Sequence, residues 1–557
     1  MSAKSEHDRG TGAWLRSGLP WIWLTAGTVS VSLVMVVGLL ALIMLRGMGH
    51  FWPQDVAELT LDSGEQVIGE FADHETVTAA RVRALGIEVP EGQEFVERYL
   101  VKTGNRDVTG TDFRWVTGVH LAETRYPEAV FVAEREEWGN FYGFVEGLRE
   151  GDQAVATGGD PWPEIRARMA RTEELRQRIR DIEKDEMGAV NYQLEQLRLR
   201  TRALELEEAA AGDPRRAAIA TERAALDARY EALAAELATL YESIGRDTLI
   251  ARTSSGEVRE LPFAGLVRLF QPNAMGIGDK LLHYLAKATE FVSDEPREAN
   301  TEGGVFPAIF GTVLMVMLMS VFVTPFGVIA AVYLREYATQ GTLTRVIRIA
   351  VNNLAGVPSV VYGVFGLGFF VYFIGGSLDQ LFYPEALPAP TFGTPGLLWS
   401  SLTLALLTVP VVIVATEEGL SRIPRSIREG SLALGATKAE TLWRTVLPMA
   451  TPAMMTGLIL AVARAAGEVA PLMMVGVVKL APSLPLDGNF PFLHLDRKFM
   501  HLGFHIYDVG FQSPNVEAAR PLVYATSLLL VVIIITLNLA AITIRNRLRE
   551  KYNAAEA

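Results

Sequence analysis

Six long apolar stretches divide this chain, and they restrict its fold more than any other feature of the sequence. They lie at Trp21–Leu45, Val305–Tyr333, Ile349–Gly375, Leu397–Ala415, Ala450–Val478 and Pro521–Ile544. A helix of about 20 apolar residues crosses the hydrocarbon layer of a membrane. We therefore expect six membrane-spanning helices, the first at residues 20–46. That stretch is longer than the apolar region of a signal peptide and lacks a convincing small-residue cleavage site, so we interpret it as an anchor.

Lysine and arginine indicate which ends of the spans share one side of the membrane, because short cytoplasmic loops collect positive charge. Four segments are basic: the N-terminal tail (1–19), the loop after the second span, the loop at 417–448 and the C-terminal tail (546–557). With six spans, all four fall on the same side. We therefore expect cytoplasmic termini and two external segments, residues 47–301 and 479–519.

The larger external segment is strongly acidic. Residues 51–300 contain 47 Asp and Glu against 30 Lys and Arg, in a chain whose formal net charge is −13. Such a segment repels nucleic acid and anionic lipid, and it would repel a free anion as well. If the cargo is an anion, another protein is expected to capture it. The chain contains no cysteine, so no disulfide holds this segment together.

Two kinds of pattern alternate in residues 47–301. Short alternating runs with Gly or Asn turn signals predict β-strands at about 53–144 and 247–270, which could form one platform. Residues 162–245 between them repeat apolar residues at spacings of three and four, with a break at Gly212-Asp213-Pro214. This spacing predicts an antiparallel coiled-coil hairpin. Three roles stay open for the hairpin: contact with a partner, a spacer, or packing back on the membrane domain.

The loop at 417–448 has a regular construction. Glu429 is followed after five residues by Gly435, and Val446-Leu447-Pro448 come after ten more. A glycine permits a sharp bend, and a proline cannot continue a helix. We therefore expect a short helix, a bend at Gly435, and a second helix that ends near Pro448.

Ionisable residues are rare in the predicted spans, so each one is informative. Arg464 and Glu468 are four residues apart, which places them on one face of a helix through the fifth span. One interpretation is an ion pair that fixes helix packing. The other is a site where the planar guanidinium donates to a tetrahedral oxyanion and Glu468 orients or balances it.

The three membrane stretches around these residues resemble one known family. YLREYATQGTLTRVIRIAVNNLAGVPSVVYGVFGL, the stretch from Val409 to Pro448, and AVARAAGEVAPLMM are similar to the PstA-type permease of the bacterial phosphate ABC importer. The loop at 417–448 resembles the EAA loop that couples such permeases to their ATPase. Gly430, Ser431 and Thr445 depart from its consensus.

The resemblance implies a type I ABC-importer permease core at 302–545, in an otherwise all-α six-helix membrane protein with an inserted β-plus-coiled-coil external domain. It assigns Glu429, Gly435, Leu447 and Pro448 to ATPase coupling. Arg464, Glu468 and Glu417 match residues of the family's substrate pathway. Some relatives have an arginine where this chain has Val414, so that arginine's role is absent or moved here. Residues 47–301 are much longer than the corresponding connection in familiar members.

The implied function is transport of inorganic phosphate by a subunit that is not itself an enzyme and needs no cofactor. The implied partners are a second, PstC-type permease, two PstB-type ATPase subunits and a PstS-type periplasmic phosphate-binding protein. The implied location is the bacterial inner membrane. Molybdate or sulfate is an alternative cargo, and an envelope sensor or scaffold is an alternative class.

Other motifs carry less weight. His494, His501 and His505 lie in the external 479–519 segment without an acidic or cysteine cluster to complete a metal site. No GxxxxGK[ST] phosphate loop occurs in the sequence, so ATP hydrolysis is expected in a partner.

Overall fold

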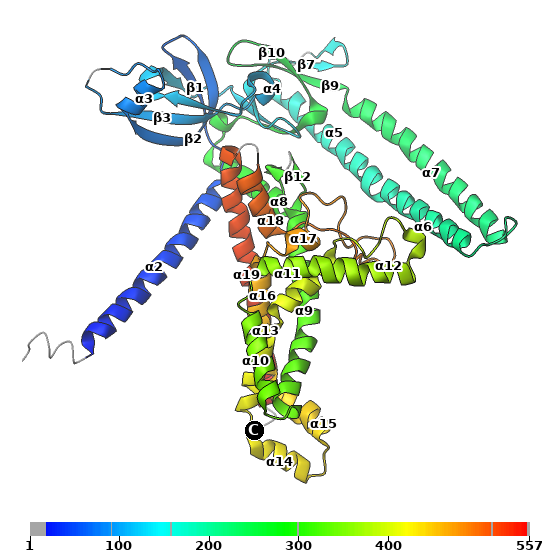
Figure 1. Cartoon of the computed structure of the whole chain (residues 1–557). Coiled ribbons are helices and arrows are strands. Elements are labelled where there is room, and N and C mark those ends of the chain that lie inside the picture. The colour runs from blue at the N-terminus through cyan, green and yellow to red at the C-terminus, as the bar shows by residue number, and fades with distance from the viewer. Residues whose placement is uncertain (1–17, 91, 156–158, 298–299, 514–515, 554–557) are drawn as a thin grey trace, which may run out of the picture.

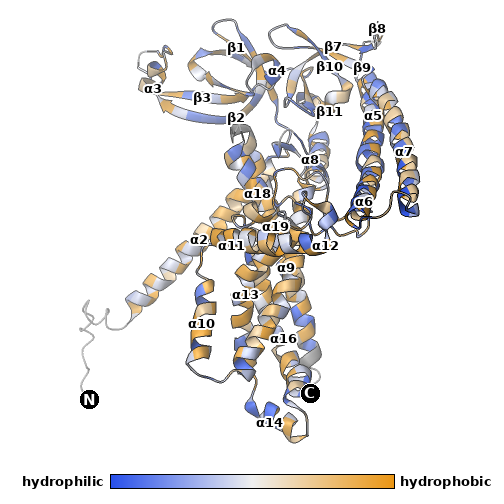
Figure 2. Cartoon of the chain, turned by 45° about the vertical axis from the view of Figure 1, so that its right-hand side comes forward, coloured by the Kyte–Doolittle hydropathy of each residue, from blue (hydrophilic) through white to orange (hydrophobic). Residues whose placement is uncertain are grey.

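The computed structural model describes residues 18–90, 92–155, 159–297, 300–513 and 516–553. Within these ranges, six helices are long and apolar enough to cross a membrane: Leu19–Gly49, Phe306–Tyr337, Ser359–Phe382, Leu397–Arg422, Lys438–Gly467 and Ala519–Leu548. The start of the first helix, the end of the last one and the loop after the fourth lie at one end of the molecule, and the β-sheets lie at the other (Figures 1 and 2). The six predicted spans are therefore confirmed, with two changes of boundary.

Four helices pack together as the membrane core. They are α9 (Phe306–Val332, continued by the π-helical turn η6, Tyr333–Tyr337), α13 (Leu397–Arg422), α16 (Leu447–Gly467) and α19 (Val516–Asn553). α13 is the most buried, because glycines let its neighbours approach closely. A Cβ at Gly327 of α9 would lie 2.6 Å from Val412, and one at Gly457 of α16 would lie 2.7 Å from Ala415. Small residues at helix contacts favour this packing in membranes.

The third span differs from its predicted position. The apolar stretch Ile349–Gly375 contains two separate helices, α10 (Thr342–Leu354) and α11 (Ser359–Phe365). Pro358 precedes α11 and disfavours a helical conformation in the residue before it, which explains the break. The span continues through η7 (Gly366–Gly375) and α12 (Gly376–Phe382) and lies crosswise to α9 and α13 (Figures 1 and 2).

The first span, α2 (Leu19–Gly49), stands apart from this core (Figure 1). Its only buried residue is Gly47, where a Cβ would lie 2.9 Å from the backbone oxygen of Tyr524 in α19. The helix is thus attached at its C-terminal end, the end nearer the β-sheets, and exposed along most of its remaining length.

Two antiparallel sheets form the β region. The first has the order β4-β3-β2-β1-β5, and the second has the order β10-β9-β7-β6-β11, with β8 beside β7. The first sheet comprises β1 (Val56–Leu61), β2 (Gln66–Thr78), β3 (Phe95–Lys102), β4 (Phe113–Thr117) and β5 (Leu121–Arg125). The second comprises β6 (Phe131–Arg135), β7 (Phe141–Glu150), β8 (Gln153–Ala154), β9 (Asp247–Arg252), β10 (Val258–Pro262) and β11 (Leu266–Phe270). The two predicted β segments therefore join in the second sheet, while the first sheet uses the earlier segment alone.

Shorter elements connect these parts. They are α3 (Ala79–Ala84), α4 (Arg106–Thr109), α8 (Ile277–Ser293), β12 (Pro296–Arg297), β13 (Glu302–Gly303), α17 (Leu472–Val475), α18 (Leu502–Tyr507) and the π-helical turn η10 (Asp508–Gln512). Short 3₁₀ turns η1, η3, η4 and η8 lie at Gly118–His120, Phe263–Gly265, Pro272–Ala274 and Pro384–Ala386.

A helical hairpin extends from the second sheet. Its two ends lie side by side because β7, which precedes the hairpin, pairs with β9, which follows it. Its first arm consists of α5 (Trp162–Arg180), the π-helical turn η2 (Asp181–Glu186) and α6 (Met187–Leu206), and its second arm is α7 (Pro214–Ile244). Asp213 caps α7 by accepting a hydrogen bond from the Arg215 amide at 2.8 Å. The two arms share an apolar seam that includes Ile182, Val190, Leu197, Leu226 and Leu233.

The π-helical turn η2 has a sequence cause. The seam residues Ile182 and Met187 are five positions apart, one more than the four that would keep the seam on one face. A π-helical turn accommodates one extra residue and restores the alignment. The supercoiling of the hairpin stays a prediction.

The hairpin packs back on the membrane domain. The Tyr192 hydroxyl of α6 donates to the backbone oxygen of Phe490, and the Tyr192 ring lies 5.9 Å from the His494 ring, edge to face. α6 also lies against the 3₁₀ turn Pro384–Ala386, which follows the third span. Of the three roles left open by the sequence, packing on the membrane domain is the one that the structure displays.

This contact can be tested by cross-linking, since the natural chain contains no cysteine. We expect a short bifunctional thiol reagent to link Tyr192→Cys to His494→Cys within one molecule, seen as an internally bridged peptide by mass spectrometry. Tyr230→Cys, which is exposed and lies on α7, the other arm of the hairpin, should not link to His494→Cys. Equal linking of both pairs would show that the hairpin does not rest on the loop.

Candidate functional site

Arg464 and Glu468 lie where the fifth span breaks. α16 ends at Gly467, and Glu468 has an extended backbone with φ −82° and ψ 130°. The predicted continuous helix to Val478 is therefore wrong, because Glu468 to Pro471 are not α-helical before the short α17. The two side chains still approach, with 3.4 Å between Arg464 Nε and Glu468 Oε1.

Two glycines allow neighbouring segments to enclose this break. A Cβ at Gly363 of α11 would lie 2.8 Å from the Cα of Pro471, and a Cβ at Gly503 of α18 would lie 2.6 Å from Val469. Irregular backbone at membrane depth is tolerated where protein or an internal cavity surrounds it. Arg464 keeps 33% of its side chain exposed, so its guanidinium has donors available beyond the single long contact with Glu468.

Glu417 lies near the opposite end of the core, on α13, and it is held by an arginine that the sequence reasoning did not assign to the site. Arg348 of α10 donates to both carboxylate oxygens, at 3.2 Å from its Nη2 and 3.3 Å from its Nε. Val414, one turn earlier on α13, is 45% exposed. A guanidinium therefore reaches this level of the core from α10, although α13 itself lacks one at position 414.

The loop after α13 contains the predicted helix, bend and helix. α14 (Arg425–Ala433) is followed by Gly435, whose φ of 90° is a conformation that glycine adopts without strain. The second helix, α15 (Lys438–Thr441), begins with a capping box in which Thr437 and Glu440 satisfy each other's backbone amides.

The predicted end of this second helix at Pro448 is wrong. α15 continues through the π-helical turn η9 (Leu442–Val446) into α16, and the helix runs from Lys438 to Gly467. Pro448 lies in the first turn of α16. The π-helical turn η9 before it is wider than an α-helical turn. It accommodates the Pro448 ring, which takes the place of a backbone N–H.

The loop is fixed to the core by polar and apolar contacts. Arg428 of α14 donates to Glu336 in η6 at 2.8 Å and to the backbone oxygens of Ile423 and Leu420. Lys438 donates to the backbone oxygen of Glu336. Leu447 is buried in an apolar cluster with Leu420, Leu442 and Val446. The loop is thus attached to the ends of α9, α13 and α16 at once.

Three large apolar side chains are exposed on the loop, among charged ones such as Arg425 and Arg444. Leu434 is 91% exposed, Trp443 is 73% exposed and Leu432 is 47% exposed. Glu429 is also exposed, and its carboxylate has no hydrogen-bond or ion-pair partner among the described residues. Sequence reasoning identified Glu429 and Gly435 but missed Leu434 and Trp443. The loop contains several other large apolar residues, so the sequence alone did not single these two out.

The three histidines of the 479–519 segment do not form a common site. His494 is paired with Asp487, with 2.9 Å between His494 Nε2 and Asp487 Oδ1. His501 and His505 are buried, and burial lowers the pKa of each to about 4. Within the part of the chain that the structure describes, no group of three or more His, Cys, Asp or Glu residues is placed to hold a metal ion.

Comparisons with known proteins agree on one family. Residues 323–553 match the family described as "binding-protein-dependent transport system inner membrane component". Phosphate transport system permease protein PstA 1 of Mycobacterium tuberculosis is 36% identical over 247 residues, which are 44% of this chain and 71% of that protein. PstA of Yersinia pestis is 32% identical over 251 residues, which are 45% of this chain and 75% of that protein.

A solved structure of the MetNI methionine ABC transporter in an inward-facing conformation is 18% identical, with a TM-score of 0.32, and the match covers 43% of this chain and 94% of that one. The family match begins at residue 323, within α9 and after the β-sheets and the helical hairpin. The chain belongs to the binding-protein-dependent transport system inner membrane components and, within them, to the PstA-type permeases.

Proposed function

We propose that this chain is a pore-forming subunit of an ATP-driven importer of inorganic phosphate in the bacterial inner membrane. Permeases of this family are not enzymes, and they work with a separate ATPase and a substrate-binding protein. The named relatives are phosphate transport permeases. The specific partners that we propose are a PstC-type permease, two PstB-type ATPase subunits and a PstS-type binding protein. The termini and the loop at 417–448 then face the cytoplasm, and residues 47–301 face the periplasm.

The observation that carries the coupling part of this proposal is the exposed side of the loop. Leu434, Trp443 and Glu429 face outward, while Arg428 and Leu447 are packed against the core. An apolar patch beside an unpaired carboxylate suits a cleft on another protein. Glu429 and Gly435 therefore belong to the docking part of the loop, whereas Leu447 and Pro448 connect it to α16. Movement of the docked loop would be transmitted to α9, α13 and α16 together.

For the anion, we propose a pathway that passes Arg464 and Glu468 and then the Arg348–Glu417 pair. Guanidinium groups donate to tetrahedral oxyanions in a planar fork. Each carboxylate compensates its arginine when no anion is present, because an unpaired charge at membrane depth is costly. Arg348 is our candidate for the role that an arginine at position 414 has in some relatives.

The bend at Gly435 provides a test of coupling. A β-branched residue at a φ of 90° is strained by about 1–2 kcal/mol or more, so Gly435→Val should tilt α14 against α15 and uncouple the ATPase. We expect reduced ATP hydrolysis in response to the binding protein, and reduced uptake, in reconstituted vesicles. Gly430→Ala is the matched control, because Gly430 is helical and no atom lies within 4 Å of its added Cβ.

Full coupling and uptake by both Gly435→Val and Glu429→Ala would show that the loop does not dock an ATPase. Co-purification of the ATPase with each variant separates lost docking from lost transmission.

The Arg464–Glu468 pair can be tested by a conservative change. Arg464→Lys keeps the charge but loses the fork, and a hydrogen bond to a charged group contributes about 1.5–3 kcal/mol. We therefore expect the phosphate concentration for half-maximal uptake to rise about tenfold or more. Arg422→Lys, in the exposed pair with Glu418, should leave it unchanged.

A merely structural pair predicts another pattern for Arg464→Lys. Thermal stability and complex yield would then fall, while the concentration dependence of uptake stayed that of the natural protein.

A further inference from the structure

The helix α8 (Ile277–Ser293) exposes its apolar face and turns its charged face toward the protein, the reverse of an ordinary surface helix. Its large exposed residues are apolar: Ile277 (83%), Leu282 (68%), Leu285 (54%), Leu281 (52%) and Val292 (44%). Asp279, in the first turn, is the only charged residue among the exposed positions of this helix. A soluble helix normally turns such a face toward a core.

The charged residues of α8 instead point into the protein. Lys280 pairs with Asp55, Lys287 lies 2.8 Å from Glu134, and Glu290 lies 2.8 Å from Arg268. Glu290 also accepts from Arg297 at 2.9 Å.

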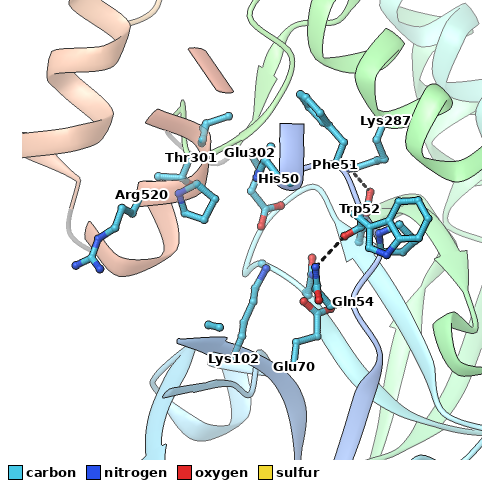
Figure 3. Close-up of a pocket in the computed structure, with 18 of the residues that line it drawn as sticks. His50, Phe51, Trp52, Gln54, Glu70, Lys102, Lys287, Thr301, Glu302 and Arg520 are labelled. Atoms are coloured by element: carbon cyan, nitrogen blue, oxygen red, sulfur yellow. Dashed lines mark hydrogen bonds and ion pairs between the residues drawn. The ribbon is translucent and has the colours of Figure 1, made fainter. Parts of the chain in front are cut away.

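Lys287 and Glu290 line a cavity of about 800 Å³ between the outer ends of α2 and α19 and the first sheet (Figure 3). The polar side of α8 therefore faces this partly open chamber, whose lining also includes the charged residues Lys102, Glu70 and Glu302. The apolar side of α8 faces the exterior of the protein.

The position of α8 identifies the surroundings of that apolar side. Phe291, in its last turn, packs with the first residues of α9 and α19 and with Phe51 at the end of α2. Phe51 and Trp52 lie 5.9 and 6.3 Å from the Tyr284 ring, in the middle of α8. Aromatic residues at the ends of apolar spans mark the boundary between hydrocarbon and water. The middle and the last turn of α8 therefore lie near the level where three spans end, while Lys280 in its first turn reaches Asp55, just before β1.

We propose that α8 lies in the outer leaflet of the bilayer as an interfacial anchor, with Ile277, Leu281, Leu282, Leu285 and Val292 in contact with lipid. The spans α2 and α19, whose ends pack with Phe291 of α8, also expose apolar surfaces. It has aliphatic side chains and lacks the exposed Arg, Tyr and Trp residues that dominate protein–protein contact energies. Interfacial helices bind membranes through such an apolar face. The anchor fixes the chamber and the β-sheets above it at a set height over the membrane.

Site-directed spin labelling can test this in the full complex, reconstituted in vesicles of phosphatidylethanolamine and phosphatidylglycerol. The absence of natural cysteine permits single labels at Leu282→Cys and Leu285→Cys. Met317→Cys, 59% exposed in the middle of α9, provides the lipid reference, and Tyr241→Cys, 50% exposed on α7, provides the water reference. Collision rates with oxygen, which partitions into lipid, and with a water-soluble nickel chelate are measured for each label.

We expect both α8 labels to collide more with oxygen than with the nickel chelate, shifted from the Tyr241 value toward the Met317 value. Collision rates like those of the Tyr241 label would place α8 in water and overturn the proposal. Low rates with both reagents would show that the second permease or another protein covers this face, and would overturn it equally. The result does not depend on which anion is transported.

Discussion

The close packing of α13 between α9 and α16 is the constraint on which the rest of the membrane domain depends. Gly327, Gly457 and Gly419 lie at these contacts, and a Cβ at any of them would come within 2.8 Å of a neighbouring side chain. α13 also carries Glu417 and leads directly into the loop that holds Glu429. Since no hydrophobic effect drives helices together inside lipid, this shape complementarity must hold the core. This packing places Arg464 and the helix break at Glu468 near one end of the core and the docking loop near the other.

Much of the membrane fold could be predicted from local pattern. Span number, the bend at Gly435 and the approach of Arg464 to Glu468 follow from apolar length, glycine chemistry and spacing, which act over a few residues. Local pattern failed where two short helices shared one apolar stretch, at Ala355 to Pro358. It failed again where the fifth span breaks at Glu468, because the segments that pack there, around Gly363 and Gly503, are distant in the sequence.

Contacts between distant parts of the chain could not be predicted from the sequence. Arg348 and Glu417 are 69 positions apart, and Tyr192 and Phe490 are 298 positions apart. No periodicity within either segment indicates the other one. The outward leucines of α8 could be read as an apolar stripe, yet only the structure shows that its charges face inward. The family match overturns the sensor or scaffold alternative, while the roles of the individual site residues stay proposals.

Import of phosphate at the expense of ATP is best measured as uptake by the purified complex. The co-purified complex would be reconstituted in vesicles, with its ATPase side supplied with ATP and the binding protein on the other side. The account predicts accumulation of labelled phosphate that requires both ATP and the binding protein and persists in an excess of molybdate or sulfate. Accumulation of molybdate or sulfate without phosphate, or phosphate movement indifferent to ATP, would contradict it.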